Sequence, residues 1–318
     1  MSLEKTTKIF VAGHRGMVGS AVVRRLQADG YRNLVLRTSK EVDLTRQAET
    51  EAFFFAEKPE YVFVAAARVG GIAANNTYRA EFIRINLAIA ANVIHSAWKA
   101  GSQGLLYFSS SCVYPRWCPQ PMKEDYLWTG ALEPTNEPYA VAKLAGMSMC
   151  RAYHDQYGVN FIAVLPTNLY GPNDNYDPQQ SHLMAALIRK FHEAKLQGSP
   201  TVSLWGTGTP RRELMYADDA ADAAVFIAKN YPGSAPLNVG WGEDLPIREI
   251  ATVVKKVVGY GGETIFNSEQ PDGALRKLTD ISRLTGLGWT PRIPLEHGVA
   301  MAYHHYLENA RTESLVSQ

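Results

Sequence analysis

Tyr139 and Lys143 stand four residues apart in the segment YAVAK, within a stretch whose apolar spacing predicts a helix over 137–158. Residues four apart share one face of a helix, so the phenol and the ammonium would be neighbours. A phenol with a pKa of about 10 is a poor acid or base at neutral pH, but a nearby ammonium stabilises the phenolate and lowers that pKa. The pair therefore predicts proton transfer, although an ordinary surface contact would have the same spacing.

A second group of reactive side chains lies in SSSCVYP, residues 109–115. Ser110 or Ser111 could donate a hydrogen bond to a substrate carbonyl. Cys112 could be a buried packing residue, a metal ligand, a nucleophile or a proton carrier. Cys112 and Cys118 are six residues apart, and the sequence contains no CxxC or HExxH, so we predict no metal site.

The scaffold for these groups is predicted by an alternation of strands and helices. Apolar runs predict buried strands at 8–13, 33–37, 60–67 and 104–110, separated by segments with helical spacing. This alternation indicates βαβ units and a parallel sheet, whose ligands bind at the carboxyl ends of the strands. The serines follow the fourth strand, which is where a ligand would lie. After about Tyr170, proline and glycine become more frequent and a second lobe begins.

The first strand leads into GHRGMVG, residues 13–19, and then into a helix. Glycines at 13, 16 and 19 let the turn close and let the backbone approach a pyrophosphate, which the helix N-terminus attracts. This context predicts a dinucleotide site, although an ordinary tight turn has a similar composition.

The end of the second strand distinguishes NAD from NADP. A carboxylate there would bind the ribose 2′-hydroxyl, but the strand ends LRTSK, with Arg37 and Lys40 and no carboxylate. Arg15 in the glycine loop adds a further positive charge. We therefore predict NADPH/NADP⁺, with a solvated charged turn as the alternative. The cationic nicotinamide of NADP⁺ would act together with Lys143 to stabilise the Tyr139 phenolate.

Composition excludes several classes of protein. The chain has 318 residues, 46% hydrophobic and 20% charged, with a net charge of +1, so no global field would attract nucleic acid or an anionic membrane. The sequence begins without an apolar leader, contains no run long enough to span a membrane, and has three cysteines. We expect a cytoplasmic enzyme.

Several longer strings resemble the GDP-L-fucose synthase family of the extended short-chain dehydrogenase/reductase superfamily, whose members are GDP-4-keto-6-deoxy-D-mannose 3,5-epimerase/4-reductases. The similarity covers nearly the whole chain. The strings are VGGIAANNTY (69–78), SSCVYP (110–115), LEPTNEPYAVAKLAG (132–146), PTNLYGPNDNY (166–176), WGTGTPRRE (205–213) and PDGALRK (271–277).

The resemblance implies an α/β fold: a Rossmann-type doubly wound parallel sheet with a smaller C-terminal α/β substrate lobe, in a homodimer that uses NADPH. We place the Rossmann domain at 1–169, with 213–240 returning to it, and the nucleotide-sugar lobe at 170–212 and 241–318. The alternative is a sister enzyme acting on another GDP-4-keto sugar, of a dideoxy or heptose form. A catalytically dead NADP-binding protein is disfavoured by the intact set of reactive side chains.

The resemblance also implies residue roles. Cys112 would be the base and His182 the acid of epimerisation, with Ser110, Tyr139 and Lys143 serving reduction. The expected cofactor contacts are Gly13, Arg15, Gly16, Met17, Val18, Gly19, Arg37, Ser39, Ser109, Lys143, Pro166, Asn168, Leu169 and His182.

The substrate GDP-4-keto-6-deoxy-mannose carries a diphosphate, which guanidinium groups bind well. The second lobe supplies Arg211, Arg276 and Lys277 as candidates, and Trp205 could stack on a base or sugar. By resemblance the substrate contacts are Lys190, Trp205, Arg212 and Asp272. Family members often have an arginine in place of Lys190 and a basic residue in place of Ser39.

Overall fold

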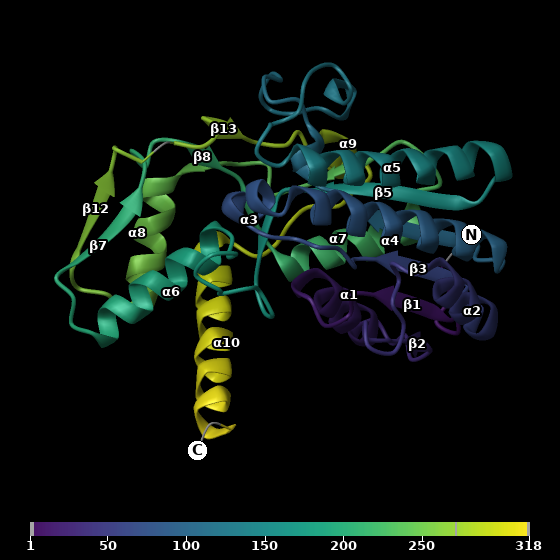
Figure 1. Cartoon of the computed structure of the whole chain (residues 1–318), viewed down its shortest axis with the longest axis horizontal. Helices are drawn as coiled ribbons and strands as arrows, with labels where there is room; N and C mark the ends of the chain where they lie inside the picture. The colour runs from purple at the N-terminus through teal and green to yellow at the C-terminus, as the bar shows by residue number, and fades with distance from the viewer. Residues whose placement is uncertain (1–2, 271, 317–318) are drawn as a thin grey trace.

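The computed structural model describes residues 3–270 and 272–316, with side chains through 310, and is built on a six-stranded parallel sheet (Figure 1). The strand order is β10-β5-β4-β3-β1-β2. The chain moves from β1 outward to β2 and returns with β3 on the other side of β1, so the order reverses at β1. Such a switch point opens a ligand groove at the carboxyl ends. The strands are β1 (Ile9–Ala12), β2 (Leu34–Val35), β3 (Tyr61–Val64), β4 (Gly104–Phe108), β5 (Asn160–Pro166) and β10 (Leu237–Val239).

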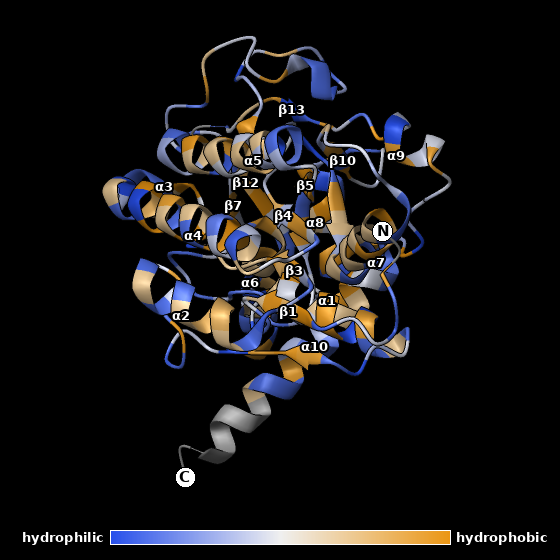
Figure 2. Ribbon diagram, turned by 90° about the vertical axis from the view of Figure 1, so that its right-hand side faces the viewer, coloured by the Kyte–Doolittle hydropathy of each residue, from blue (hydrophilic) through white to orange (hydrophobic). Residues whose placement is uncertain are grey.

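Helices cover both faces of this sheet, as Figure 2 shows, which explains why β1, β3 and β4 are apolar at every position. One face packs against α1 (Met17–Ala28) and α7 (Ala217–Asn230), and their side chains form one continuous core with alternate strand residues. The other face packs against α2 (Gln47–Glu57), α4 (Arg79–Lys99) and α5 (Glu137–Tyr157). The predicted doubly wound Rossmann-type fold is confirmed.

The second strand is shorter than predicted. We expected it over 33–37, but β2 contains only Leu34 and Val35, which pair with Ile9 and Phe10. The reason is that β2 is the edge strand, and the chain beyond it turns into a loop held by side-chain bonds of Arg37 and Thr38.

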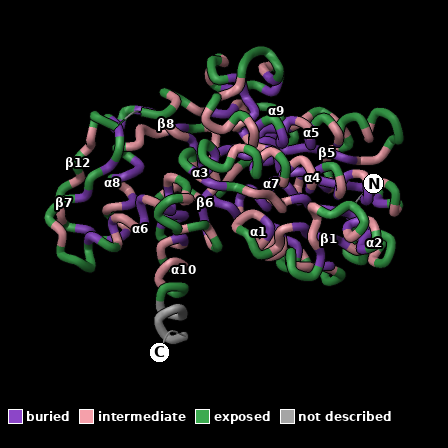
Figure 3. Tube along the Cα trace, viewed as in Figure 1, coloured by how far each residue is buried: buried purple, intermediate pink, exposed green. Residues whose placement is uncertain are grey.

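A second, smaller core lies at the left of Figure 1, where helices pack on short strands. Figure 3 shows buried segments within this lobe beneath an exposed outer edge. Its elements are α6 (Leu183–Leu196), β7 (Thr201–Trp205), β8 (Arg211–Arg212), β11 (Leu245–Pro246), α8 (Ile247–Val258), β12 (Glu263–Asn267), β13 (Arg276–Lys277) and α10 (Leu295–Val316).

The two cores are joined by short elements. β6 (Asn168–Tyr170) continues from β5 and pairs with β9 (Leu214–Tyr216). α9 (Ser282–Gly286) returns to the sheet, where Leu284 is buried in the core with α7. α3 (Ile72–Thr77) follows β3 at its carboxyl end. The boundaries of the two predicted domains stay a prediction.

Candidate active site

The glycine loop packs so closely against neighbouring backbone that two of its glycines leave no room for a side chain. Gly13 has φ +82°, and a Cβ added there would lie 2.7 Å from the Ala66 nitrogen. A Cβ on Gly19 would lie 2.1 Å from the Gly13 carbonyl oxygen. Gly16 caps α1 without a side-chain bond, and Met17 and Val18 form the first turn, so the N–H groups at this helix end point outward for a pyrophosphate. The residues present therefore fit a dinucleotide.

The surface beside this loop, formed by the residues that follow β2, carries less positive charge than the sequence indicates. Arg15 and Ser39 are exposed, but Arg37 is paired with Glu57 at 2.7 Å. Glu41 turns back so that Oε2 accepts hydrogen bonds of 2.7 Å from both the backbone N–H and the hydroxyl of Thr38. Contrary to our expectation, a carboxylate does lie near the end of the second strand, because a turn brings Glu41 back to Thr38, three residues earlier.

Tyr139 and Lys143 lie on α5 beside the end of β4, as predicted. The Nζ atom of Lys143, a residue only 3% exposed, donates to the Phe108 carbonyl at 2.7 Å, and burial lowers the pKa of this lysine to about 7. Burial, and next the charge of Cys112, raise the pKa of Tyr139, while a hydrogen bond with Ser110 acts in the opposite direction. In the protein without cofactor, desolvation of the phenolate thus outweighs the hydrogen bond that favours it, and the lowering of this pKa by the lysine together with a cationic nicotinamide stays a prediction.

The strand ends bring the other predicted cofactor contacts together. Ser109 is buried and its hydroxyl donates to the Lys143 carbonyl at 3.3 Å. Pro166 is the last residue of β5, which pairs with β4, and Asn168 and Leu169 follow in β6. These residues thus gather at one edge of the sheet, near the glycine loop that follows β1.

Cys112 directly follows the predicted serine pair and is the middle residue of a short turn, Ser111–Val113. It lies in a 3-10 helix whose N-terminus is capped by Ser110, because the serine Oγ accepts from the Cys112 N–H at 3.1 Å. The thiol is half-buried, and the Nζ atom of Lys277 approaches its Sγ at 4.0 Å. Sequence reasoning treated Lys277 only as a possible phosphate contact, and nothing local in the sequence links it to a cysteine 165 residues away.

Lys277 belongs to β13, in a three-stranded sheet of order β11-β8-β13. The four basic residues of β8 and β13 lie in two pairs on opposite faces of this sheet. In the register of β8 and β13, Arg211 pairs with Arg276 and Arg212 pairs with Lys277. Successive residues of a strand point to opposite faces, so the two pairs separate. Burial lowers the pKa of Arg212, while Asp272 and then Cys112 counteract this, which places Arg212 near the thiol as well.

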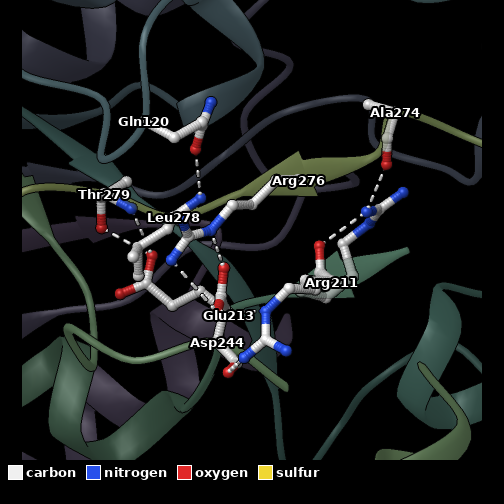
Figure 4. Close-up of polar contacts among 9 residues, drawn as sticks. Gln120, Arg211, Glu213, Asp244, Ala274, Arg276, Leu278 and Thr279 are labelled. Atoms are coloured by element: carbon white, nitrogen blue, oxygen red, sulfur yellow. Dashed lines mark hydrogen bonds and ion pairs between the residues drawn. The ribbon is translucent and has the colours of Figure 1, made fainter. Parts of the chain in front are cut away.

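On the other face of this sheet, Asp244 contacts both Arg211 and Arg276, as Figure 4 shows. The carboxylate accepts from Arg211 Nε at 2.8 Å and from Arg276 Nε at 2.5 Å. Arg211 and Arg276 therefore share one carboxylate, which gives both a structural role, and their predicted contact with a diphosphate stays a prediction. Arg212 instead donates to the backbone carbonyls of Arg211 and Ala274, and neither it nor Lys277 forms an ion pair with any described carboxylate.

His182 is the N-cap residue of α6, where its side chain forms no capping hydrogen bond, and the residue as a whole is solvent-exposed. Surrounding protein desolvates the imidazolium and lowers the pKa of His182. The preceding residues lie against the loop that follows β3: the Gly71 N–H donates to the Gln180 carbonyl at 2.9 Å. This contact brings His182 to the carboxyl edge of the sheet, although it lies in the second lobe's first helix.

The remaining predicted substrate contacts lie at the second lobe's edge. Trp205 ends β7 with 69% of its surface exposed, and the Nζ atom of Lys190 is 3.4 Å from the Ser203 carbonyl oxygen. Asp272 has both oxygens engaged by Thr207, at 2.9 Å from its N–H and 2.7 Å from its hydroxyl. Asp272 therefore stabilises the WGTG turn, residues 205–208, through Thr207, and it also lies near Arg212.

Neither a metal cluster nor a helix able to cross a membrane is found in the part of the chain that the structure describes.

Comparisons with known proteins agree with this geometry. Residues 9–240 match the NAD dependent epimerase/dehydratase family, and the chain belongs to that family. GDP-L-fucose synthase 1 of Arabidopsis thaliana is 55% identical over 306 residues, covering 96% of this chain and 95% of the relative. GDP-L-fucose synthase of Escherichia coli strain K12 is 48% identical over 311 residues, covering 95% and 97%. Within the larger class, the chain is therefore a member of the GDP-L-fucose synthase family.

Solved structures similar to this chain include a reductase with its cofactor bound. The GDP-mannoheptose C4 reductase of Campylobacter jejuni, with NADP bound, superposes with a TM-score of 0.89 at 40% identity, covering 96% of this chain and 99% of that one.

Proposed function

We propose that this protein converts GDP-4-keto-6-deoxy-D-mannose to GDP-L-fucose by epimerising C3 and C5 and then reducing the C4 ketone. The observation that carries the proposal is the environment of Cys112. The thiol stands two residues from Ser110, at the strand end shared with Tyr139 and Lys143, and has a lysine 4.0 Å away. A reductase alone needs no such thiol, whereas inversion beside a ketone needs a base and an acid.

The first half of the reaction is assigned to Cys112 and His182. Ser110 and Tyr139 hold the C4 oxygen, so negative charge can develop there when a proton leaves the adjacent carbon. Cys112, acting as a thiolate, removes that proton, and Lys277 and Arg212 are the cations that lie beside its sulfur. His182 returns a proton to the opposite face of the sugar. After solvent has taken the proton from Cys112 and reprotonated His182, the same exchange at the second carbon inverts the other centre.

The second half is assigned to the tyrosine–lysine pair. NADPH, when bound, supplies the hydride that reduces C4, and the glycine loop, Arg15, Arg37 and Ser39 would hold it. Tyr139 donates the proton to the C4 oxygen, and its raised pKa keeps the phenol protonated until then. Lys143, held by the Phe108 carbonyl, orients the site and supports the phenolate left behind.

The positive charges of the second lobe indicate where the anionic substrate would bind. Arg212 and Lys277 stand side by side, and neither forms a direct ion pair with a described carboxylate, although Asp272 lies near Arg212, so an anion placed between them relieves their repulsion. The diphosphate of the GDP-sugar, or the charge developing on the sugar, meets that need. The exposed face of Trp205 offers a stacking surface. Lys190 and Asp272 complete the proposed substrate contacts.

The test is the product formed from GDP-4-keto-6-deoxy-mannose and NADPH. We expect one NADPH consumed per sugar, and nuclear magnetic resonance coupling constants of GDP-L-fucose. A 4-hydroxy product with uninverted C3 or C5 would overturn the assignment and favour the alternative, a sister enzyme. The GDP-mannoheptose reductase supports that alternative, so a GDP-4-keto-heptose is the matched control substrate.

We also expect a homodimer in the cytoplasm. Sedimentation equilibrium of the purified chain tests the dimer, and a fluorescent fusion in the source cell tests the location.

A further inference from the structure

The segment VGGIAANNTY, residues 69–78, contributes no side chain to the proposed chemistry, yet it touches the segment that leads into His182. The Gly71 N–H donates to the Gln180 carbonyl at 2.9 Å. A Cβ added at Gly71 would lie 2.8 Å from the Ser181 carbonyl oxygen. Backbone therefore packs directly on backbone one residue before the proposed acid.

The same segment reaches Tyr139 on its other side. A Cβ added at Gly70 would lie 3.3 Å from the tip of the Phe82 ring, a side chain only 1% exposed. The edge of Phe82 packs against the Tyr139 ring, with centroids 6.3 Å apart and planes at 75°. A line of contacts thus runs from Gln180 and Ser181, which directly precede His182, through the two glycines and Phe82 to Tyr139.

Asn75 holds together the turn of residues 70–75, which we call the corner. Its side chain is 6% exposed, and its Nδ2 atom donates to the carbonyls of Gly70 at 2.7 Å and Gly71 at 3.1 Å. Gly71 has φ −65°, which any residue adopts, so the demand for glycine there is one of space and not of backbone conformation. Close approach to residues 180–181 is what the corner provides.

We propose that Gly70, Gly71 and Asn75 are positioning residues that set where His182 stands relative to Tyr139. The inference rests on the proposed function, because the role of His182 as acid belongs to it. Tyr139 holds the ketone while His182 must reach a neighbouring carbon from the opposite face, and the corner is the packed connection between the two. Reduction at C4 needs Tyr139 but does not need His182 to reach a neighbouring carbon. Disturbing the corner should therefore slow proton exchange more than it slows reduction.

The first test is Gly71→Ala, compared with Gly261→Ala, which has no heavy atom within 4 Å of the added Cβ. The Gly71 variant pushes Ser181 away by a few tenths of an ångström or more. Because small displacements of reacting groups are costly, we expect substrate deuterium exchange in heavy water to fall by about tenfold to a hundredfold, with NADPH affinity kept. Gly261→Ala should exchange at the wild-type rate.

A second variant keeps the inference testable if Gly71→Ala does not fold. Asn75→Ala removes two hydrogen bonds without adding volume, and the exposed neighbour Asn76→Ala is its matched control. In all four variants the His182 ring signals, identified by their loss in His182→Gln, are followed by nuclear magnetic resonance against pH. We expect the chemical shifts and midpoint to move in the two corner variants and not in the two controls.

The outcomes separate the two proposals. Wild-type exchange and an unchanged His182 titration in the folded corner variants would overturn the positioning role. If the wild-type protein itself does not exchange deuterium, the proposed function fails, and the His182 titration alone then decides whether the corner positions that ring.

Discussion

Replacing Lys143 with methionine should stabilise the protein near neutral pH while abolishing its reductase activity. The lysine is almost fully buried, and its pKa is lowered from 10.5 to about 7. Between these two values the unfolded chain binds a proton that the folded protein does not. The folded state therefore gains stability as pH rises through this window, and is penalised by the lysine below it.

The magnitude follows from the two pKa values. At about 1.36 kcal/mol per pKa unit, the buried lysine costs the folded state roughly 4 kcal/mol at pH 7 and roughly 2 kcal/mol at pH 9. Lys143→Met removes this cost but also removes the hydrogen bond to the Phe108 carbonyl, a loss of about 1 kcal/mol that does not depend on pH. The advantage of the variant over wild type should thus shrink by about 2 kcal/mol between pH 7 and pH 9.

The assay is urea denaturation of both proteins at pH 7, 8 and 9 without cofactor. Lys40→Met, at an exposed lysine, is the control and should show a pH-independent difference from wild type. A Lys143→Met difference that stays constant across this range would refute the reasoning, because the lysine would then be charged in the folded protein.

Three further predictions concern the cofactor loop, the substrate cations and the small sheet. Gly19→Ala forces a Cβ to within 2.1 Å of the Gly13 carbonyl oxygen, so calorimetric titration should show NADPH affinity reduced by about tenfold or more, whereas Gly286→Ala, which has open space, should bind normally. Arg212→Met should raise the KM for the GDP-sugar by about tenfold to a hundredfold and leave NADPH affinity unchanged in fluorescence titration; an unchanged KM would remove Arg212 from the substrate site. Asp244→Asn leaves Arg211 and Arg276 without their carboxylate, and chemical denaturation should show a loss of about 3 kcal/mol; a loss below that of an exposed Asp177→Asn control would contradict the structural role.

The parts of the fold set by local sequence signals could be predicted from the sequence. The apolar run before GHRGMVG and the helical spacing after it produce β1, the turn and α1, because strand, glycine and helix signals agree there. The spacing of Tyr139 and Lys143 likewise places both on α5. β2 was predicted too long because an edge strand has only one partner, and after Val35 the chain leaves β1 for the loop in which Thr38 bonds to Glu41.

The electrostatics of the site depended on contacts that no local pattern reveals. Glu41 returns to Thr38 through a turn, and Arg211 and Arg276 are drawn to Asp244, so three charges differ from their predicted surroundings. The approach of Lys277 to Cys112 depends on the pairing of β13 with β8. Such tertiary pairing is set by the folded chain, and it decides which of many similar cations serves the site.

Cys112 carries the central claim, and deuterium uptake tests it most directly. GDP-4-keto-6-deoxy-mannose is incubated in heavy water with the protein, without NADPH, and the positions of deuterium in the sugar are read by mass spectrometry and nuclear magnetic resonance. We predict uptake at C3 and C5 with wild-type protein, and loss of both in Cys112→Ala while NADPH still binds. Normal uptake in Cys112→Ala would contradict the account, and wild-type uptake at C5 without C3 would contradict the assignment to GDP-L-fucose.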